Sequence, residues 1–295
     1  MTLVMTIANR KGGVGKTTLA VALAETFVFE HRKDTVILDL DPQSSASEIL
    51  LSEADYADRI ENDRALPAYF RKAMQASCQL EEKTIARARH SLVGRGKVDL
   101  AIVPNSTELW DVEFEALRSG HEQKYRMAVT TLIESLKAEY KVIIVDTPPG
   151  KTMAAEEAIV ASDVVICPIV PERLSVWGMD RMKEYFEDLG TRRSLPPWKF
   201  VVSKLTTQFA QANAQVEHLR TNYPDNFLVD RIGLPGFGRT ELVGLRQTQS
   251  IIHRIARFRD HPDDVKTLQG FYGADATQQL IRIARKLQEV HSNNA

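Results

Sequence analysis

The chain has 295 residues, with 38 basic and 39 acidic side chains and a formal net charge of -1. Its composition, 43% hydrophobic and 26% charged, is that of an ordinary globular protein. These values exclude a disordered chain, a collagen-like chain and a protein that is basic throughout, but they do not exclude a local basic patch. Two cysteines, Cys78 and Cys167, lie far apart in the sequence, which argues against a disulfide framework or a cysteine zinc site.

Short apolar runs alternate with longer helical stretches, a pattern that predicts a doubly wound α/β fold with a mostly parallel sheet flanked by helices. We expect one domain over residues 1–295, with a helical excursion at about 52–97. An amphipathic helix is expected at about 275–290 and another helix at 16–30. The expected strands are Leu3–Ala8, Thr35–Asp39, Val98–Val103, Val142–Asp146, Val164–Ile169 and Lys199–Ser203.

The N-terminus has neither the basic flank nor the cleavage site of a signal peptide. No apolar stretch reaches the roughly 18 residues that a spanning helix needs. We therefore expect a cytoplasmic protein.

The strongest motif is a glycine-rich loop between the first strand and the first helix. Glycines allow a tight turn, and backbone N–H groups at a helix N-terminus can surround a phosphate. The usual GxxxxGK[ST] pattern is not met, because its first glycine would fall on Arg10, and a second lysine follows instead. The predicted phosphate-binding residues are Lys11, Gly12, Gly13, Val14, Gly15, Lys16, Thr17 and Thr18.

KGGVGKTT at 11–18 resembles the deviant Walker A motif of the ParA/MinD family of P-loop ATPases, and the resemblance continues along most of residues 1–240. VILDLDPQSS at 36–45 resembles switch I, and VIIVDTPPG at 142–150 resembles Walker B with switch II. VDLAIVPNSTEL at 98–109 and ICPIVPERLSVWG at 166–178 resemble the family's further strand-and-loop segments. The DPQ sequence is typical of the ParA branch.

The resemblance implies ATP and Mg²⁺ as ligands and assigns roles to the motif residues. Lys16 contacts the β- and γ-phosphates, and Lys11 reaches phosphates bound by the other subunit of a nucleotide-sandwich dimer. Asp41 orients the attacking water. Magnesium is held by Thr17, Asp41 and Asp146.

Two further assignments are less specific. Asp39 either helps to position the water ligands of Mg²⁺ or caps the end of its strand. Adenine recognition in the family involves residues after the sixth strand and a later proline loop, which correspond here to Ser203-Lys204 and to Pro235.

Positive charge is concentrated near the C-terminus, where residues 231–295 carry 10 basic and 6 acidic side chains. ParA-like ATPases bind DNA non-specifically through basic residues in this part of the chain, as dimers with ATP bound. Contacts to backbone phosphates are sufficient for such binding. The alternative is that these side chains are solvated or paired with nearby aspartates. The candidate DNA-binding residues are Arg239, Arg246, Arg254, Arg257 and Arg259.

The resemblance predicts a nucleoid-associated ATPase that segregates plasmid or chromosomal DNA with a ParB-like partner. The chain starts at its first strand, so we expect no N-terminal helix-turn-helix extension and no operator-specific binding. Positioning of a protein cargo is an open alternative. MinD-like membrane binding through the last helix is the main rival, although its modest aliphatic face favours packing on the protein's own core.

Two other classes fit the sequence less well. Cys78 and Cys167 do not lie in the loops that would share an iron–sulfur cluster. Synthetase relatives lack a lysine at the position of Lys11.

Overall fold

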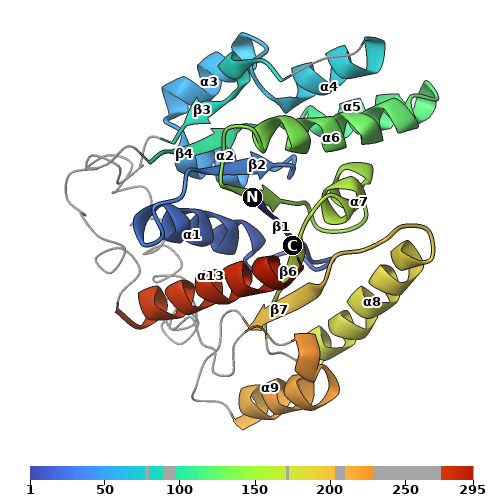
Figure 1. The fold of residues 1–295 in the computed structure, drawn as a ribbon. Helices are drawn as coiled ribbons and strands as arrows, with labels where there is room; N and C mark the ends of the chain where they lie inside the picture. Colours follow the sequence, from blue (N-terminus) through green and yellow to red (C-terminus); the bar gives the residue numbers. More distant parts are fainter. Residues whose placement is uncertain are drawn as a thin grey trace.

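A seven-stranded sheet forms the centre of the protein (Figure 1). The computed structural model describes residues 1–76, 80–88, 98–170, 173–202, 210–226, 228 and 274–294. The strands are β1 (Leu3–Ile7), β2 (Thr35–Asp39), β3 (Ala86–Arg87), β4 (Leu100–Val103), β5 (Val142–Asp146), β6 (Val164–Ile169) and β7 (Trp198–Val202). Their spatial order is β3-β4-β2-β5-β1-β6-β7, and only β3 pairs antiparallel with its neighbour. This topology confirms the expected doubly wound α/β fold.

The helices lie on both faces of this sheet. They are α1 (Lys16–Phe29), α2 (Ser45–Leu50), α3 (Glu53–Glu61), α4 (Leu66–Gln75), α5 (Leu109–Arg118), α6 (Glu122–Leu136), α7 (Met153–Val160), α8 (Arg173–Gly190), α9 (Ala210–Asn222) and α13 (Ala274–Asn294), with short 3₁₀ turns η1 (Glu82–Thr84) and η2 (Pro224–Asn226). Strands β1, β2 and β5 are buried along their whole length, as their continuous apolar sequences predict.

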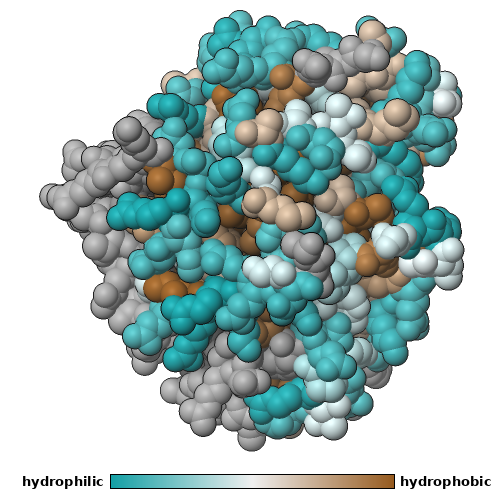
Figure 2. All heavy atoms as spheres, in the orientation of Figure 1, coloured by the Kyte–Doolittle hydropathy of each residue, from teal (hydrophilic) through white to brown (hydrophobic). Residues whose placement is uncertain are grey.

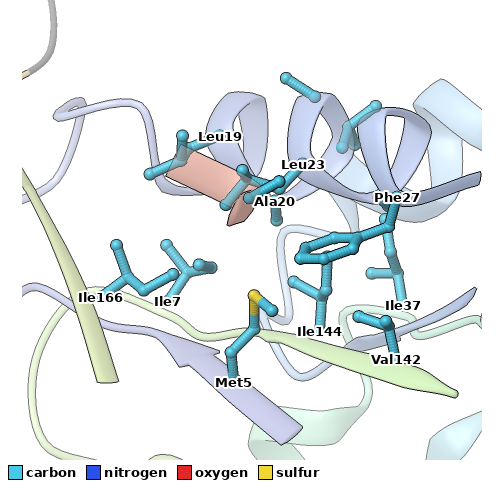
Figure 3. Close-up of a cluster of buried hydrophobic side chains, with 14 of the residues drawn as sticks. Met5, Ile7, Leu19, Ala20, Leu23, Phe27, Ile37, Val142, Ile144 and Ile166 are labelled. Carbon is cyan, nitrogen blue, oxygen red and sulfur yellow. The ribbon is translucent and has the colours of Figure 1, made fainter. Parts of the chain in front are cut away.

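Alternate residues of each central strand pack against different helices. Met5 and Ile144 belong to a cluster with α1 and α13, whereas Val4 and Val145 belong to a cluster with α4, α5, α6 and α7. Figure 3 shows Leu23 and Phe27 of α1 directed toward strand residues such as Ile144. Burial of such side chains stabilises the fold by about 1.5–3 kcal/mol each, so the sheet is a rigid base for the loops at its carboxyl edge.

The C-terminal helix α13 packs beside α1 on the same face of the sheet (Figure 1). Its apolar stripe is fully buried there and consists of Leu280, Ile283, Ala284 and Leu287. On the face shown in Figure 2, hydrophilic residues cover most of the surface. The apolar stripe of α13 thus packs on the protein's own core, as the sequence favoured. Within the described part of the chain, no helix combines the length and apolar character needed to span a membrane.

The excursion at 52–97 contains α3, α4, η1 and the two-residue edge strand β3 as far as it is described. The sequence predicted the helical character but not β3, because two residues are too short for a period-two pattern. At this edge Arg87 is exposed and pairs with Asp99 at 3.0 Å. At the other edge, the backbone N–H of Leu228 donates to the carbonyl of Phe200 in β7.

Candidate nucleotide-binding site

The predicted phosphate and metal residues gather at the carboxyl ends of three adjacent strands. Strand β5 lies between β1 and β2, and Asp146 is in register with both Ile7 and Asp39. The loops after these strands therefore meet at one edge of the sheet, which is where open α/β folds bind ligands.

The glycine-rich loop has the backbone conformation that a phosphate loop requires. Gly13 and Gly15 have φ angles of 72° and 90°, in the left-handed region where a side chain is strained. Helix α1 begins directly after Gly15, and no side chain caps its N-terminus. The amide groups of the first turn are thus left for an anion, which the helix dipole also favours.

The loop is anchored to strand β6 through Asn9. The Asn9 side-chain amide donates to the carbonyl of Pro168 at 2.8 Å, and its Oδ1 accepts from the backbone N–H of Lys11 at 2.9 Å. These two bonds hold the backbone at Lys11 against the end of β6, so the position from which the Lys11 side chain extends is fixed.

Lys16 is held inside this loop and is only 6% exposed. Its Nζ lies 3.5 Å from the carbonyl oxygen of Lys11. Burial lowers the pKa of Lys16, whereas the carboxylates of Asp146 and Asp41 raise it. A bound phosphate would add negative charge and favour the ammonium form, which is the form that binds it.

Asp146 is fully buried, and neither of its oxygens makes a hydrogen bond of normal geometry to any described residue. Burial raises its pKa well above the ordinary value, and Asp39 adds to this, while the nearby Thr17 hydroxyl and Lys16 favour the charged form. A buried carboxylate without such partners is costly unless a cation or ligand completes it. Asp146 and Thr17 therefore fit a magnesium ion, which typically uses one or two protein oxygens together with water and phosphate.

Both carboxylate oxygens of Asp39 accept hydrogen bonds from other groups of the protein. Its Oδ2 accepts hydrogen bonds from the backbone N–H and the hydroxyl of Ser47, at 2.9 and 2.7 Å. Its Oδ1 accepts from the backbone N–H of Asp41 at 3.2 Å. Burial raises the pKa of Asp39 to about 7, while the bonds from Ser47 oppose the rise. Of the two roles left open by the sequence, these bonds favour the structural cap.

Asp41 lies in a tight turn next to this group. Its Oδ1 accepts from the backbone N–H of Gln43 at 2.9 Å, and its carbonyl accepts from Ser44 N–H at 2.8 Å. Ser44 takes up the turn with a φ angle of 55°. The carboxylate is thus oriented by its own turn and lies near enough to Lys16 to affect its pKa.

The segment after Asp146 is fixed at both ends. Thr147 donates its hydroxyl to the carbonyl of Ile7 at 2.8 Å, and Thr152 caps α7 by accepting from Ala155 N–H at 3.1 Å. The sequence did not single out Glu113 of α5, whose Oε1 accepts from Met153 N–H at 2.6 Å. No local motif marks Glu113, because its partner is 40 residues away.

Several predicted residues lie outside the described part of the chain. They are Pro235, Arg239, Arg246, Arg254, Arg257 and Arg259, together with Ser203-Lys204 and Cys78. Cys167 is buried in β6, and burial raises the pKa of its thiol. Over the described ranges, no group of three or more His, Cys, Asp and Glu side chains could hold a metal ion.

The glycine loop between a buried strand and a helix, with Lys16, Thr17 and Asp146 around it, defines a P-loop nucleotide-binding fold. Residues 2–195 match the family described as AAA domain, and the chain belongs to this family and, within it, to the ParA/MinD type of P-loop ATPases. It is 30% identical over 228 residues to an uncharacterized protein of Methanocaldococcus jannaschii, covering 76% of this chain and 81% of that one.

A second relative has a described role. The chain is 27% identical over 179 residues to the chromosome partitioning protein ParA of Myxococcus xanthus. The match covers 61% of this chain and 56% of that protein, so it spans less than two thirds of the relative's length.

Two solved structures share the fold. A plasmid partition protein of Borrelia burgdorferi bound to AMPPNP has a TM-score of 0.59 and 21% identity, covering 79% of this chain and 85% of that one. Cobyrinic acid a,c-diamide synthase of Mycobacterium smegmatis, with ADP and magnesium, has a TM-score of 0.64 and 17% identity, covering 90% and 98%. At these identities the likeness shows the fold alone.

Proposed function

We propose that this protein is a Mg²⁺-dependent ATPase that forms an ATP-dependent sandwich dimer, binds DNA without sequence preference and segregates DNA with a ParB-like adaptor. The observation that carries the ATPase assignment is the fully buried Asp146 beside Lys16 and Thr17, at the mouth of the glycine loop. A purely structural loop has no need for an unsatisfied buried carboxylate.

In this proposal the chain's own residues bind and orient the triphosphate. The amides of the first turn of α1 and the Lys16 ammonium bind the phosphate oxygens. Thr17 and Asp146 hold Mg²⁺, with Asp41 nearby, and the bound ion supplies positive charge toward those oxygens. The Asp41 carboxylate, oriented by Gln43 N–H, accepts a hydrogen bond from the attacking water.

Dimer formation is assigned to Lys11, which directly precedes Gly12 and is anchored through Asn9. A second cation supplied by the partner subunit stabilises charge on the transferring phosphoryl group. It also makes association depend on the γ-phosphate, so that ATP acts as a switch.

The DNA and adaptor roles are supported by the relatives described as partition proteins and by the basic C-terminal sequence. A DNA-bound dimer would be associated with the nucleoid. Positioning of a protein cargo uses the same cycle and stays an alternative. Membrane binding through α13 is disfavoured, because its apolar stripe is already buried against the core.

The deciding experiment is binding to random-sequence duplex DNA with ATP, with ADP and without nucleotide, over a series of salt concentrations. Binding with ATP only, with a steep salt dependence, supports the proposal. Failure under all conditions, with ATP bound and the protein folded, contradicts DNA binding, and liposomes would then be tested as the alternative surface.

Two variants separate the steps of the cycle. We expect Lys11→Ala to bind ATP as a monomer and to lose the dimer, which sedimentation velocity measures. We expect Asp41→Ala to bind ATP but to stay dimeric, because hydrolysis is blocked. Normal hydrolysis by Asp41→Ala would remove its assigned role, and a normal ATP-dependent dimer of Lys11→Ala would remove the contact in trans.

A further inference from the structure

The hydroxyl of Ser47 lies inside the protein, close to the turn that carries Asp41. Ser47 belongs to the short helix α2 and is fully buried. Its hydroxyl donates to Oδ2 of Asp39 at 2.7 Å, and its Oγ accepts from the backbone N–H of Asn105 at 3.0 Å. A single side chain on α2 therefore bonds both to the end of β2 and to the segment that follows β4.

The sheet brings these two segments together. Strands β2 and β4 are parallel neighbours, with Leu38 in register with Val103, so the chain leaves both strands at the same edge. The Asp39 carboxylate and the Asn105 N–H are both buried there and need hydrogen-bond partners. A hydroxyl can donate to one group and accept from the other at the same time.

The helix itself does not require a serine at this position. Alanine has the higher helix propensity and would fit a buried site of this size. Helix α2 is also held by Ala46 and Leu50, which pack in the same apolar cluster as α1. Removing the Ser47 hydroxyl should therefore leave α2 in place while depriving Asp39 and Asn105 of a partner.

Asp39 connects Ser47 with Asp41. Oδ2 of Asp39 accepts both donors of Ser47, the hydroxyl and the backbone N–H at 2.9 Å, whereas Oδ1 accepts from the backbone N–H of Asp41 at 3.2 Å. The orientation of the Asp39 carboxylate thus depends on Ser47, and the backbone of Asp41 depends on Asp39. The Asp41 side chain then accepts from Gln43 N–H within its own turn.

We propose that Ser47 is a positioning residue for Asp41. Its hydroxyl, bonded to Asn105 N–H, orients the Asp39 carboxylate, which holds the Asp41 backbone where the Asp41 side chain can act on the attacking water. Misplacement of a reacting group by about 1 Å can cost about a hundredfold in rate, so a contact outside the site can control turnover. The effect on hydrolysis rests on the proposed ATPase function, whereas the placement of the Asp41 backbone does not.

The kinetic test compares three variants. Ser47→Ala removes the hydroxyl, Ser47→Thr keeps it, and Ser45→Ala in the same helix is the matched control. Single-turnover hydrolysis of radiolabelled ATP gives the rate, and titration with a fluorescent ATP analogue gives the Kd. We expect Ser47→Ala to lower the rate by about tenfold or more with the Kd within about twofold of the wild type, because binding is kept and orientation is lost. Ser47→Thr and Ser45→Ala should stay within about threefold of the wild-type rate.

The placement of Asp41 is measured separately by residue-resolved hydrogen exchange of the nucleotide-free protein. In Ser47→Ala, the Asp41 amide should exchange about tenfold faster or more, because its acceptor is no longer held. The Leu40 amide is the internal control, since it donates to the carbonyl of Asp146 at 2.8 Å and not to Asp39. Its exchange should stay at the wild-type rate, and Ser47→Thr should leave both amides unchanged.

Three results would overturn the proposal. They are unchanged Asp41 exchange in Ser47→Ala, equal acceleration of the Leu40 and Asp41 amides, or a raised Kd with an unchanged rate of hydrolysis. Circular dichroism and Tm check the folding of each variant. If the added methyl group of Ser47→Thr lowers the Tm, the comparison of Ser47→Ala with Ser45→Ala decides. If the wild type hydrolyses no ATP, the proposed function fails, and hydrogen exchange still decides whether Ser47 places Asp41.

Discussion

Asp146 and Glu157 are two buried acids only eleven residues apart, and their surroundings are opposite. Glu157 of α7 accepts from Arg126 at 2.9 Å and from both terminal nitrogens of Arg193, at 3.0 and 2.9 Å. Asp146 has no such bond within the described structure. Glu157 therefore joins α6, α7 and the segment after α8 as a structural ion pair, whereas Asp146 is left to be completed by a ligand. Burial alone does not distinguish the two roles, but the hydrogen-bond partners do.

The largest expected effect concerns the nucleotide-binding residues around Asp146. Lys16→Ala should lower ATP hydrolysis by about a hundred- to a thousandfold, as loss of one group that stabilises transition-state charge does in other enzymes. Single-turnover hydrolysis of radiolabelled ATP measures it. Lys33→Ala, an exposed lysine on the loop after α1, is the control. A Lys16→Ala rate within a few fold of the wild type would contradict the phosphate-binding assignment.

On the structural side, Glu157→Ala should lower the free energy of unfolding by about 2–3 kcal/mol, because it removes three charge-assisted hydrogen bonds to a buried acid. Arg193 loses its acid, whereas Arg126 keeps its pair with Glu156. Urea unfolding followed by circular dichroism measures the change. Glu134→Ala, which removes an exposed partner of Lys137, should cost no more than about 1 kcal/mol. If both variants cost the same, Glu157 does not have the structural role described above.

Asp146→Asn should change the free energy of unfolding of the nucleotide-free protein in the opposite direction. Removing a buried carboxylate whose desolvation is only partly offset by Lys16 and Thr17 should raise the free energy of unfolding by about 1–2 kcal/mol near neutral pH. The same variant should lose the stabilisation that Mg²⁺ and ATP give the wild type, because the ion loses a ligand. Thermal unfolding with and without Mg²⁺-ATP tests both, with Asp188→Asn as an exposed control. Destabilisation of the nucleotide-free protein would mean that Lys16 and Thr17 fully compensate the buried carboxylate.

The last prediction concerns the pH dependence of stability through Asp39, which changes the shape of the stability curve and leaves hydrolysis out of the measurement. Its pKa of about 7 in the folded protein exceeds the ordinary value near 3.9, so folding favours the protonated form. Its stabilising contribution is complete below about pH 4 and is lost as the pH rises toward 7. Asp39→Asn should therefore flatten the stability curve between these values, whereas exposed Asp58→Asn should not. Parallel curves for wild type and Asp39→Asn would contradict the raised pKa.

The sequence predicts the strands and the nucleotide-binding motifs better than it predicts the ion pairs that hold the helices together. Strands β2, β5 and β6 begin and end as expected, because continuous β-branched runs are strong local signals. The glycine loop and Asp146 also stand out in the sequence, since each directly follows or ends an apolar strand within its own short motif, although the two motifs lie far apart in the chain. Glu113 and the Arg126–Glu157–Arg193 group were missed. Their partners are 31 to 40 residues apart, and no spacing rule links them.

The roles of Asp39 and Asp41 show a second limit. Asp39 ends β2 and Asp41 lies just after it, and only the three-dimensional contacts distinguish them. Ser47 donates hydrogen bonds to Asp39, whereas the Asp41 carboxylate accepts one from Gln43 in its own turn. A sequence motif places acids near a site, but it does not assign the solvation or bonding of each.

The two sheet edges have a consequence for how copies of this protein can associate. At one edge, β3 is only two residues long and ends in a charged, exposed Arg87. Such an edge offers little backbone for pairing with a strand of another molecule, a device that also limits aggregation. The other outer strand, β7, is already bonded to Leu228. Continuation of the sheet from one copy into the next through β3 is therefore disfavoured, and association on that side of the molecule depends on the side chains of loops and helices.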